Sequence, residues 1–163
     1  MMIGDSARSY FAEKIKQLLG TEPCRIQVAA LPWRKGPDGV EIMLITSRDT
    51  GRWVLPKGWP EKDERLCEAA LREADEEAGL SGAVCRREAG RYHYAKVSRN
   101  GEEFPCEVIV FPLEVDKVAE KWKERRQRDR KWMSAAEASR IVHEPSLGEL
   151  IAVFCADPRK YAA

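Results

Sequence analysis

The amino-acid sequence predicts an α/β sandwich built around a mixed β-sheet. Three observations predict this fold class. Runs rich in β-branched and aromatic residues recur between clusters of turn residues. One long helix pattern interrupts these runs, and a second group of helix patterns ends the chain. Because strands and helices are mixed without a strict strand–helix–strand alternation, a mixed sheet is favoured.

The composition is that of an ordinary globular protein with one domain. The chain has 163 residues, of which 44% are hydrophobic and 34% charged, and its formal net charge is +1. No apolar run approaches the length that spans a bilayer, and the first residues contain no apolar segment typical of a signal peptide. Five scattered cysteines lack metal-binding spacing, so we expect reduced thiols and a cytoplasmic protein without membrane attachment.

The first residues predict a short helix outside the main domain. Ser6 or Ser9 is a candidate cap, Gly20 ends the pattern, and apolar residues fall at helical spacing between them: Phe11, Ile15, Leu18 and Leu19. We therefore expect an N-terminal helical extension over residues 1–22 and the main domain over residues 23–163.

The predicted strands come in two groups. The segments "RIQVAALPW" and "VEIMLITS" flank the turn "RKGPDG", which predicts a hairpin, and "GRWVLP" predicts a further short strand. Later in the chain, "AVCRREAGRYHYAKV" and "FPCEVIVFPLEV" predict two strands joined by the turn "SRNGEE".

The predicted helices have recognisable ends. "EKDERLCEAALREADEEAGL" gives the strongest pattern, from about Asp63, and Gly79 is placed to end it. After a basic segment flanked by tryptophans, Ser134 and Glu137 form a capping-box pattern at the start of "SAAEASRIV". A last helix is expected over "SLGELIAVF".

The strongest helix carries an unfavourable concentration of acids. At 100° per residue, Glu73 and Glu77 share one flank beside the apolar stripe, and Glu76 lies within a turn of both. Like charges at this spacing destabilise a helix, and the helix dipole disfavours anions in the last turn. Local rule-breaking of this kind is expected at functional sites, and a hard divalent cation such as Mg²⁺ would resolve it.

The spacing around these acids is specific. Gly58 is followed after five residues by Glu64, and after seven more by the run "READEEAGL", Arg72 to Leu80. This register resembles the Nudix box, with Ala74 smaller than the usual aliphatic residue and with Trp59 and Pro60 in place of a second glycine after Gly58. The resemblance covers about residues 24–154 and implies a Nudix-type α/β/α sandwich.

The resemblance also implies a reaction and the residues that perform it. Nudix hydrolases cleave a diphosphate linkage by attack of water on phosphorus, with Mg²⁺ or Mn²⁺ on the diphosphate. Glu73 and Glu77 would ligate the metal together with the backbone carbonyl of Lys57. Glu76 would be the water-activating base or a further ligand, so Glu73 and Glu76 are the expected catalytic residues. Four residues of the motif are expected to be structural: Gly58, Glu64, Arg72 and Gly79.

The flanking segments resemble one branch of the family more than others. "SRDTGRWVLPKGW" and "AAEASRIVHEPSLGEL" are similar to diphosphoinositol polyphosphate phosphohydrolases, which also cleave diadenosine polyphosphates. That resemblance implies phosphate-binding residues from three segments: Arg25, Ser47 with Arg48, and Arg128 with Arg130. Lys57 is a further candidate for phosphate binding. Glu144 departs from it, because animal relatives carry a lysine there.

Several alternatives stay open at this point. Nucleotide sugars, ADP-ribose and nucleoside triphosphates are other candidate substrates, and a non-catalytic module that binds a phosphorylated ligand belongs to another class. The basic run "KWKERRQRDRKW" suits a polyphosphorylated small molecule, but it is also compatible with a solvated loop anchored by Trp122 and Trp132. Nucleic acid is disfavoured, because the run is short and the whole chain is not basic. His93 and His143 have no partner at ligand spacing and are expected to be ordinary strand or loop residues. The oligomeric state is not predicted.

Overall fold

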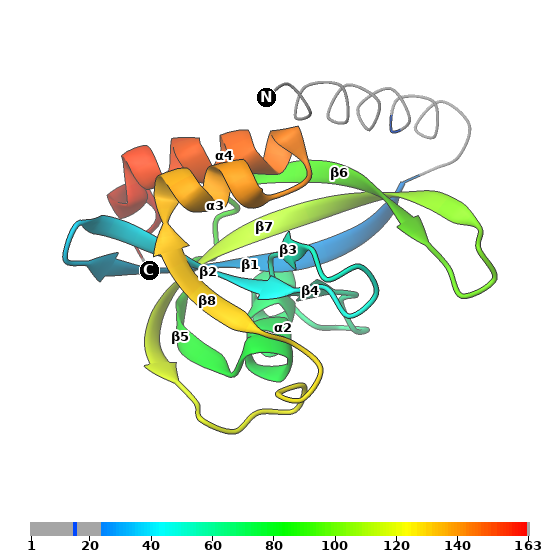
Figure 1. The fold of residues 1–163 in the computed structure, drawn as a ribbon, viewed down its shortest axis with the longest axis horizontal. Helices are drawn as coiled ribbons and strands as arrows, with labels where there is room; N and C mark the ends of the chain where they lie inside the picture. Colours follow the sequence, from blue (N-terminus) through cyan, green and yellow to red (C-terminus); the bar gives the residue numbers. More distant parts are fainter. Residues whose placement is uncertain (1–14, 16–23, 163) are drawn as a thin grey trace.

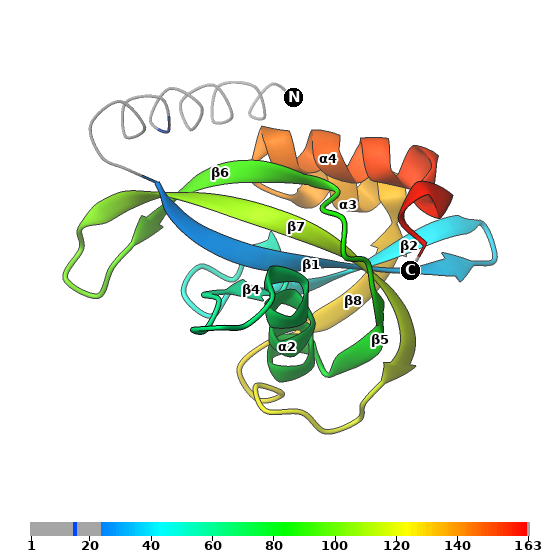
Figure 2. The ribbon, with the colours of Figure 1, turned by 180° about the vertical axis from the view of Figure 1, so that it is seen from behind.

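The computed structural model describes Ile15 and residues 24–162, and these form a three-layer α/β/α sandwich (Figure 1). A twisted mixed sheet makes the middle layer. Helix α2 (Leu66–Ala78) covers one face of the sheet, and helices α3 (Ala135–Ile141) and α4 (Pro145–Ala156) cover the other (Figures 1 and 2). The predicted fold class is therefore confirmed.

The sheet is mixed because one central pair of strands is parallel. Strand β1 lies beside β7 in parallel register, with Arg25 opposite Cys106, whereas every other pair of strands in the described part is antiparallel. The main path through the sheet is β3-β2-β1-β7-β5, while β4 pairs with β1, β6 with β7, and β8 with β2. The strands are β1 (Arg25–Gly36), β2 (Gly39–Thr46), β3 (Trp53–Val54), β4 (Lys57–Gly58), β5 (Leu80–Val84), β6 (Gly90–Val97), β7 (Glu103–Val118) and β8 (Arg130–Ser134).

The predicted hairpin and the two late helices form as expected. Gly36 pairs with Gly39 at the β1–β2 turn, and Gly39 has a φ of 127°, a conformation that glycine adopts at low cost. At α3, the Ser134 hydroxyl accepts the Glu137 N–H at 3.1 Å, which is half of the predicted capping box. Helix α4 begins with Pro145 at its first turn, where its missing N–H leaves no bond unmade.

One prediction about the strands is wrong, and one strand was not predicted. The segment 83–97 is not one strand, because residues 85–89 break it and its two ends pair with different halves of the 16-residue strand β7. Gly82 lies at an irregularity of β5, with a φ of 158° and the Glu114 carbonyl 2.0 Å from where a Cβ would lie. The end of the basic segment is also a strand, β8, which pairs with β2. Helix α2 begins at Leu66, a few residues later than expected.

Two apolar clusters hold the three layers together. One lies between the sheet and α2 and includes Ala70, Ala74 and Ile109, and the other lies between the sheet and α3 and α4. The predicted N-terminal helix falls outside the described residues except for Ile15, which is helical and buried. Within the described part of the chain, no helix has the length and apolar character needed to cross a membrane.

Candidate functional site

The helical phase of α2 places two acids at the sheet and two in solvent. Glu73 and Glu77 are each only 8% exposed, although they are charged residues, whereas Glu68 and Asp75 on the same helix are exposed. Carboxylates are rarely this buried unless they bind a cation. The buried pair therefore marks the functional face of α2.

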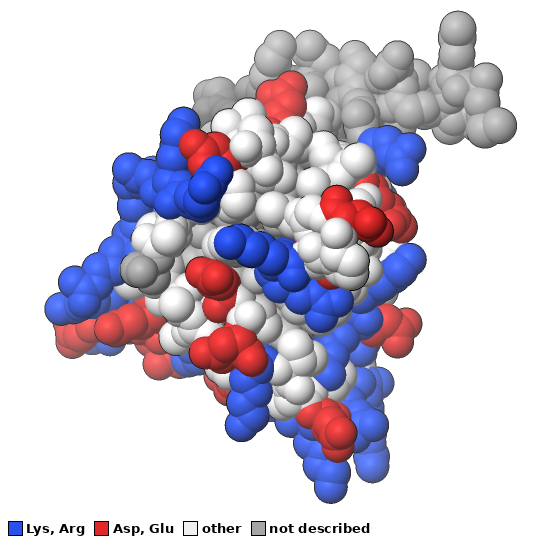
Figure 3. Space-filling model, turned by 90° about the vertical axis from the view of Figure 1, so that its left-hand side faces the viewer, with Lys and Arg blue, Asp and Glu red and all other residues white. Residues whose placement is uncertain are grey.

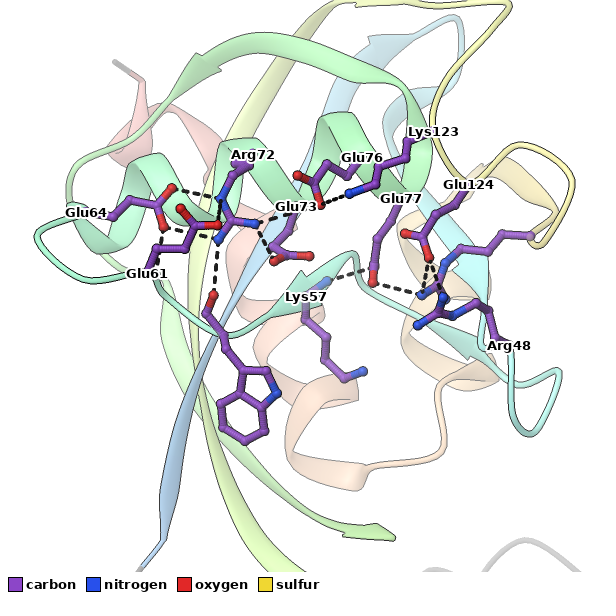
Figure 4. Close-up of polar contacts among 12 residues, drawn as sticks. Arg48, Lys57, Glu61, Glu64, Arg72, Glu73, Glu76, Glu77, Lys123 and Glu124 are labelled. Atoms are coloured by element: carbon purple, nitrogen blue, oxygen red, sulfur yellow. Dashed lines mark hydrogen bonds and ion pairs between the residues drawn. The ribbon is translucent and has the colours of Figure 1, made fainter. Parts of the chain in front are cut away.

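Arg72 ties the β4 loop to helix α2. Its Nε donates to Glu64 Oε1 at 2.9 Å, and its Nη2 donates both to Glu64 Oε2 and to the Trp59 carbonyl at 3.1 Å (Figure 4). A further nitrogen, Nη1, lies 2.8 Å from Glu73 Oε1. This bidentate contact with Glu64 is geometrically specific as well as strong. The loop that carries Lys57 and Gly58 is thus held at a fixed distance from the acids.

Glu77 is held by contacts from two other segments. The backbone N–H of Lys57 donates to its Oε2 at 3.1 Å, and Arg128 Nη2 donates to its Oε1 at 2.8 Å. The Arg128 side chain is itself only 7% exposed and also donates to the Thr46 carbonyl at 3.0 Å. Glu124 lies close by, 3.0 Å from Arg48 and 3.6 Å from Arg128 (Figure 4). Four charged residues from three segments therefore form one network beside β4.

Burial sets the protonation of these groups. It raises the pKa of Glu77 to about 7, although the charge of Arg128 and the hydrogen bond from Lys57 oppose the shift. Burial likewise raises the pKa of Glu73 against the contacts with Arg72. The same cause lowers the pKa of the Lys57 ammonium, with Glu77 opposing. The site is therefore a place where charge is costly unless a counter-ion is supplied.

The raised pKa of Glu77 predicts a pH-dependent stability for the metal-free protein. Between about pH 4.5 and 7, the folded state binds more protons than the unfolded state, so the free energy of unfolding decreases as pH rises through this window. The loss is expected to be on the order of 1–3 kcal/mol. Glu77→Gln removes this part of the dependence, because the amide does not ionise, although its one oxygen keeps only one of the two contacts from Lys57 and Arg128.

Urea unfolding of both proteins in the presence of a chelator, from about pH 5 to about pH 8, measures the difference. If the two proteins lose the same stability over this range, burial of the Glu77 charge is not its cause.

The carboxylates and backbone carbonyl of the site are chemically suited to a hard divalent cation. In the present side-chain positions, however, they do not surround one common ion position. In the described residues, no group of three acidic, histidine or cysteine side chains is arranged around a common ion position. Glu73 is turned to Arg72, and Glu77 to Arg128. A Cβ on Gly58 would lie 2.3 Å from Glu73 Oε1. Because glycine has no side chain, the Glu73 carboxylate can approach the backbone of β4. Carboxylate and carbonyl oxygens are the ligands that Mg²⁺ prefers.

A hollow of about 450 Å³ opens in front of these groups, and we call it the site hollow. Its lining is polar and comes from β1, the two loops around β3 and β4, α2, β6 and the segment before β8. It is lined by Gln27, Ser47, Arg48, Asp49, Lys57, Gly58, Trp59, Pro60, Glu61, Arg72, Glu73, Glu77, Lys96 and Arg128.

Most of the residues predicted to act in catalysis, metal binding or phosphate binding line this hollow, and three do not. Glu76 is half-buried outside the lining, 3.6 Å from Lys123 and 3.8 Å from Arg72. Arg130 donates to the Ala78 and Ala119 carbonyls, each at 2.6 Å, and its guanidinium lies on the Trp122 ring. Arg25 lies over the Phe104 ring at 4.0 Å. The structure thus places Arg130 at the carboxyl end of α2, where a cation also complements the helix dipole.

Sequence reasoning missed two residues of the site. Glu124 is 8% exposed and pairs with Arg48 and Arg128, and Lys96 of β6 lines the site hollow. One signal for Glu124 was available, because it is an acid four residues before Arg128 inside a basic run. Lys96 gave none, because its place depends on the pairing of β6 with β7. His93 bonds to Glu107 at 2.9 Å on the sheet, in line with the expectation for this residue.

Comparison with known proteins identifies relatives along most of the chain. Residues 25–154 match the NUDIX domain family. Nudix hydrolase 21 of Arabidopsis thaliana, a chloroplastic protein, is 32% identical over 93% of this chain and 72% of its own length. Diphosphoinositol polyphosphate phosphohydrolase 3-alpha of Mus musculus is 27% identical over 77% of this chain and 74% of its own length. The crystal structure of the C. elegans Ap4A hydrolase superposes with a TM-score of 0.60 at 21% identity, over 82% of this chain and 98% of that one.

Proposed function

The chain belongs to the Nudix hydrolase family, and from this premise we propose that it hydrolyses a diphosphate linkage in a polyphosphorylated small molecule with Mg²⁺ or Mn²⁺. Diadenosine polyphosphates and diphosphoinositol polyphosphates are the proposed substrates. One observation carries the proposal: two buried carboxylates of α2 line a hollow that also receives cations from three separate segments, Arg48, Lys57 and Arg128. This pairing of acids and cations suits a metal-bound polyphosphate.

Different residues of the chain would bind the metal, accept the proton of water and position the β4 loop. Glu73, Glu77 and the Lys57 carbonyl would hold the metal, with Glu76 as a further candidate ligand. When bound, the metal would neutralise charge on the diphosphate and lower the pKa of a bound water. Glu76 is half-buried at the end of the same helix and would take the proton from the attacking water. Arg72 would keep the β4 loop against α2 throughout, because its contacts to Glu64 and Trp59 do not involve the substrate.

The cations of the site hollow would bind the remaining phosphates. Arg48 is 54% exposed at its side chain, and Ser47 and Lys96 lie in the same lining. Charged groups around a hollow raise the local concentration of an oppositely charged ligand. On the face drawn in Figure 3, lysines and arginines are interspersed with acids, and they do not form the continuous basic stripe that nucleic acid requires. This pattern argues against a nucleic-acid interface on that face.

Released phosphate, measured with Mg²⁺ and with Mn²⁺, tests the proposal. The panel holds a diadenosine polyphosphate, a diphosphoinositol polyphosphate, a nucleotide sugar, ADP-ribose and a nucleoside triphosphate, with a phosphatase added where the product is a monoester. We expect hydrolysis of the first two ahead of the others, and no hydrolysis without metal. If no compound is cleaved although one binds, the protein is a phosphate-ligand-binding module. If ADP-ribose is preferred, the substrate assignment is wrong.

Arg48→Ala is expected to raise KM for the polyphosphate about tenfold with a smaller effect on kcat, because a charge-assisted contact to a remote phosphate is lost. The effect should shrink as salt screens the exposed charge, and it should be small for ADP-ribose. Arg91→Ala is the matched control, since Arg91 is a similarly exposed, ion-paired arginine outside the hollow. An unchanged KM in Arg48→Ala would remove Arg48 from the binding site. Arg128→Ala is expected to raise KM likewise and to lower kcat as well, because it also frees Glu77.

A further inference from the structure

A second hollow of about 430 Å³ adjoins the site hollow, and it has a different character. The two hollows share Ser47, Asp49, Lys57 and Lys96, so a ligand that fills one reaches the other past Lys57. The second hollow is in larger part apolar. Its further lining comes from the β2–β3 loop, β3, β6, the β6–β7 turn and the N-cap of α4: Thr50, Arg52, Val54, Tyr92, Tyr94, Ala95, Val97, Ser98, Arg99 and Glu144.

Charge is distributed unevenly in the second hollow. Arg52 and Arg99 are exposed, which places them at its opening, whereas Tyr92 is 1% exposed and Glu144 is 9% exposed. The Lys57 ammonium lies 5.1 Å from the centre of the Tyr94 ring, between the two hollows. Asp49 in the lining is exposed as well, so the opening holds two arginines and one acid and is basic on balance, whereas the inner end is aromatic and acidic.

Glu144 is a buried carboxylate that forms no ion pair with the described residues. It stands at the N-cap of α4, but its side chain makes no capping hydrogen bond. Its carboxylate accepts a hydrogen bond from its own backbone N–H. Among the residues that the structure describes, no other side chain forms an ion pair or hydrogen bond with it, and Lys57 and Arg52 act on it only through their charge. Burial raises its pKa. A buried acceptor of this kind is stabilised by a ligand that donates a hydrogen bond and destabilised by a ligand that brings another anion.

We propose that Glu144 is a specificity-determining residue, which accepts a hydrogen bond from an uncharged, donor-bearing ring such as a nucleoside and excludes a phosphorylated ring from the second hollow. The apolar and aromatic wall formed by Val54, Tyr92 and Tyr94 suits the ring, and the basic opening suits the phosphates that lead to it. The proposal rests on the proposed function and narrows it, because it places diadenosine polyphosphates ahead of diphosphoinositol polyphosphates.

Calorimetric titration without metal tests the selectivity separately from hydrolysis. The probes are AMP and inositol hexakisphosphate, and the proteins are wild type, Glu144→Gln, Glu144→Lys and the control Glu149→Lys, which reverses an exposed charge on the same helix. In Glu144→Lys we expect AMP to bind at least about tenfold more weakly and inositol hexakisphosphate at least about tenfold more tightly. Glu144→Gln should shift both affinities in the same directions by about threefold or more. Glu149→Lys should leave their ratio unchanged.

Three outcomes overturn the proposal. These are wild-type protein that binds neither probe, wild-type protein that prefers inositol hexakisphosphate, and Glu144 variants that keep the wild-type ratio of affinities while they remain folded by circular dichroism. Glu144→Gln keeps the test valid if Glu144→Lys does not fold, because glutamine has nearly the same shape and no charge. The hydrolysis panel tests the proposed reaction separately from the role of Glu144. Selective AMP binding without phosphate release would contradict the proposed reaction and leave the role of Glu144 intact.

Discussion

Glu73→Gln and Glu77→Gln are each expected to lower kcat by at least about 10²-fold, the loss that accompanies removal of a group stabilising charge in the transition state. Both side chains are buried at the site hollow and carry two of the oxygens that would hold the metal. The amide keeps the shape and one acceptor oxygen, so Glu73→Gln can keep the contact from Arg72, and Glu77→Gln can keep the contact from either Arg128 or Lys57. The metal-free variants are expected to be as stable as wild type or slightly more stable, because a buried negative charge is gone.

Steady-state kinetics with saturating Mg²⁺ measure this effect, and thermal unfolding with and without Mg²⁺ measures metal binding directly. Asp75→Asn and Glu68→Gln are the matched controls, because these exposed acids lie on the same helix and point away from the hollow. We expect both controls to keep the wild-type kcat and the wild-type shift on addition of Mg²⁺. Activity in either buried variant close to that of the controls would mean that the acids of α2 do not form the metal site.

The parts of the site that the sequence predicted have local causes. A period of 100° per residue is enough to bury Glu73 and Glu77 and to expose Asp75. Gly79 ends α2 with a φ of 66°, and its N–H bonds back to the last turn, as a glycine after a helix commonly does. The pairing of Arg72 with Glu64 also depends on a fixed and short spacing along the chain. Each of these features is decided within about twenty residues.

The parts that the sequence did not predict depend on distant partners. The sequence of β8 resembles a basic loop, because it begins with an arginine and a lysine. It forms a strand because it pairs with β2, which is distant in the sequence. Arg130 resembles a phosphate ligand in the sequence, but in the fold its guanidinium lies on the Trp122 ring and donates to the Ala78 and Ala119 carbonyls. Likewise, the two hollows meet because the β2–β3 loop, β4 and β6, which lie far apart in the sequence, each contribute to both linings. No pattern within one segment contains this information.

Gly58→Ala is expected to separate folding from catalysis. A Cβ at this position would lie 2.3 Å from Glu73 Oε1 and 2.4 Å from its Cδ, so the carboxylate must move. The atoms that move are the end of a flexible side chain, and Gly58 does not have the positive φ that would strain an alanine. The melting temperature should therefore change by no more than about 3 °C. The displaced carboxylate should lower kcat/KM by about 10- to 10²-fold, because a shift of about 1 Å in a catalytic group has effects of this size.

Gly36→Ala provides a close control for this substitution. A Cβ on Gly36 would lie 2.4 Å from Glu41 Oε1, so it displaces a glutamate carboxylate in the same way, but at the β1–β2 hairpin and outside both hollows. We expect Gly36→Ala to keep wild-type kcat/KM and the wild-type thermal shift with Mg²⁺, and Gly58→Ala to lose most of both. If the two variants are equally active, the position of the Glu73 carboxylate against the β4 backbone does not matter for the reaction. The variant is expected to stay folded because the Glu73 carboxylate can move away from the new Cβ at low cost. If Gly58→Ala instead unfolds, that carboxylate cannot move, and its contact with Arg72 holds it in place.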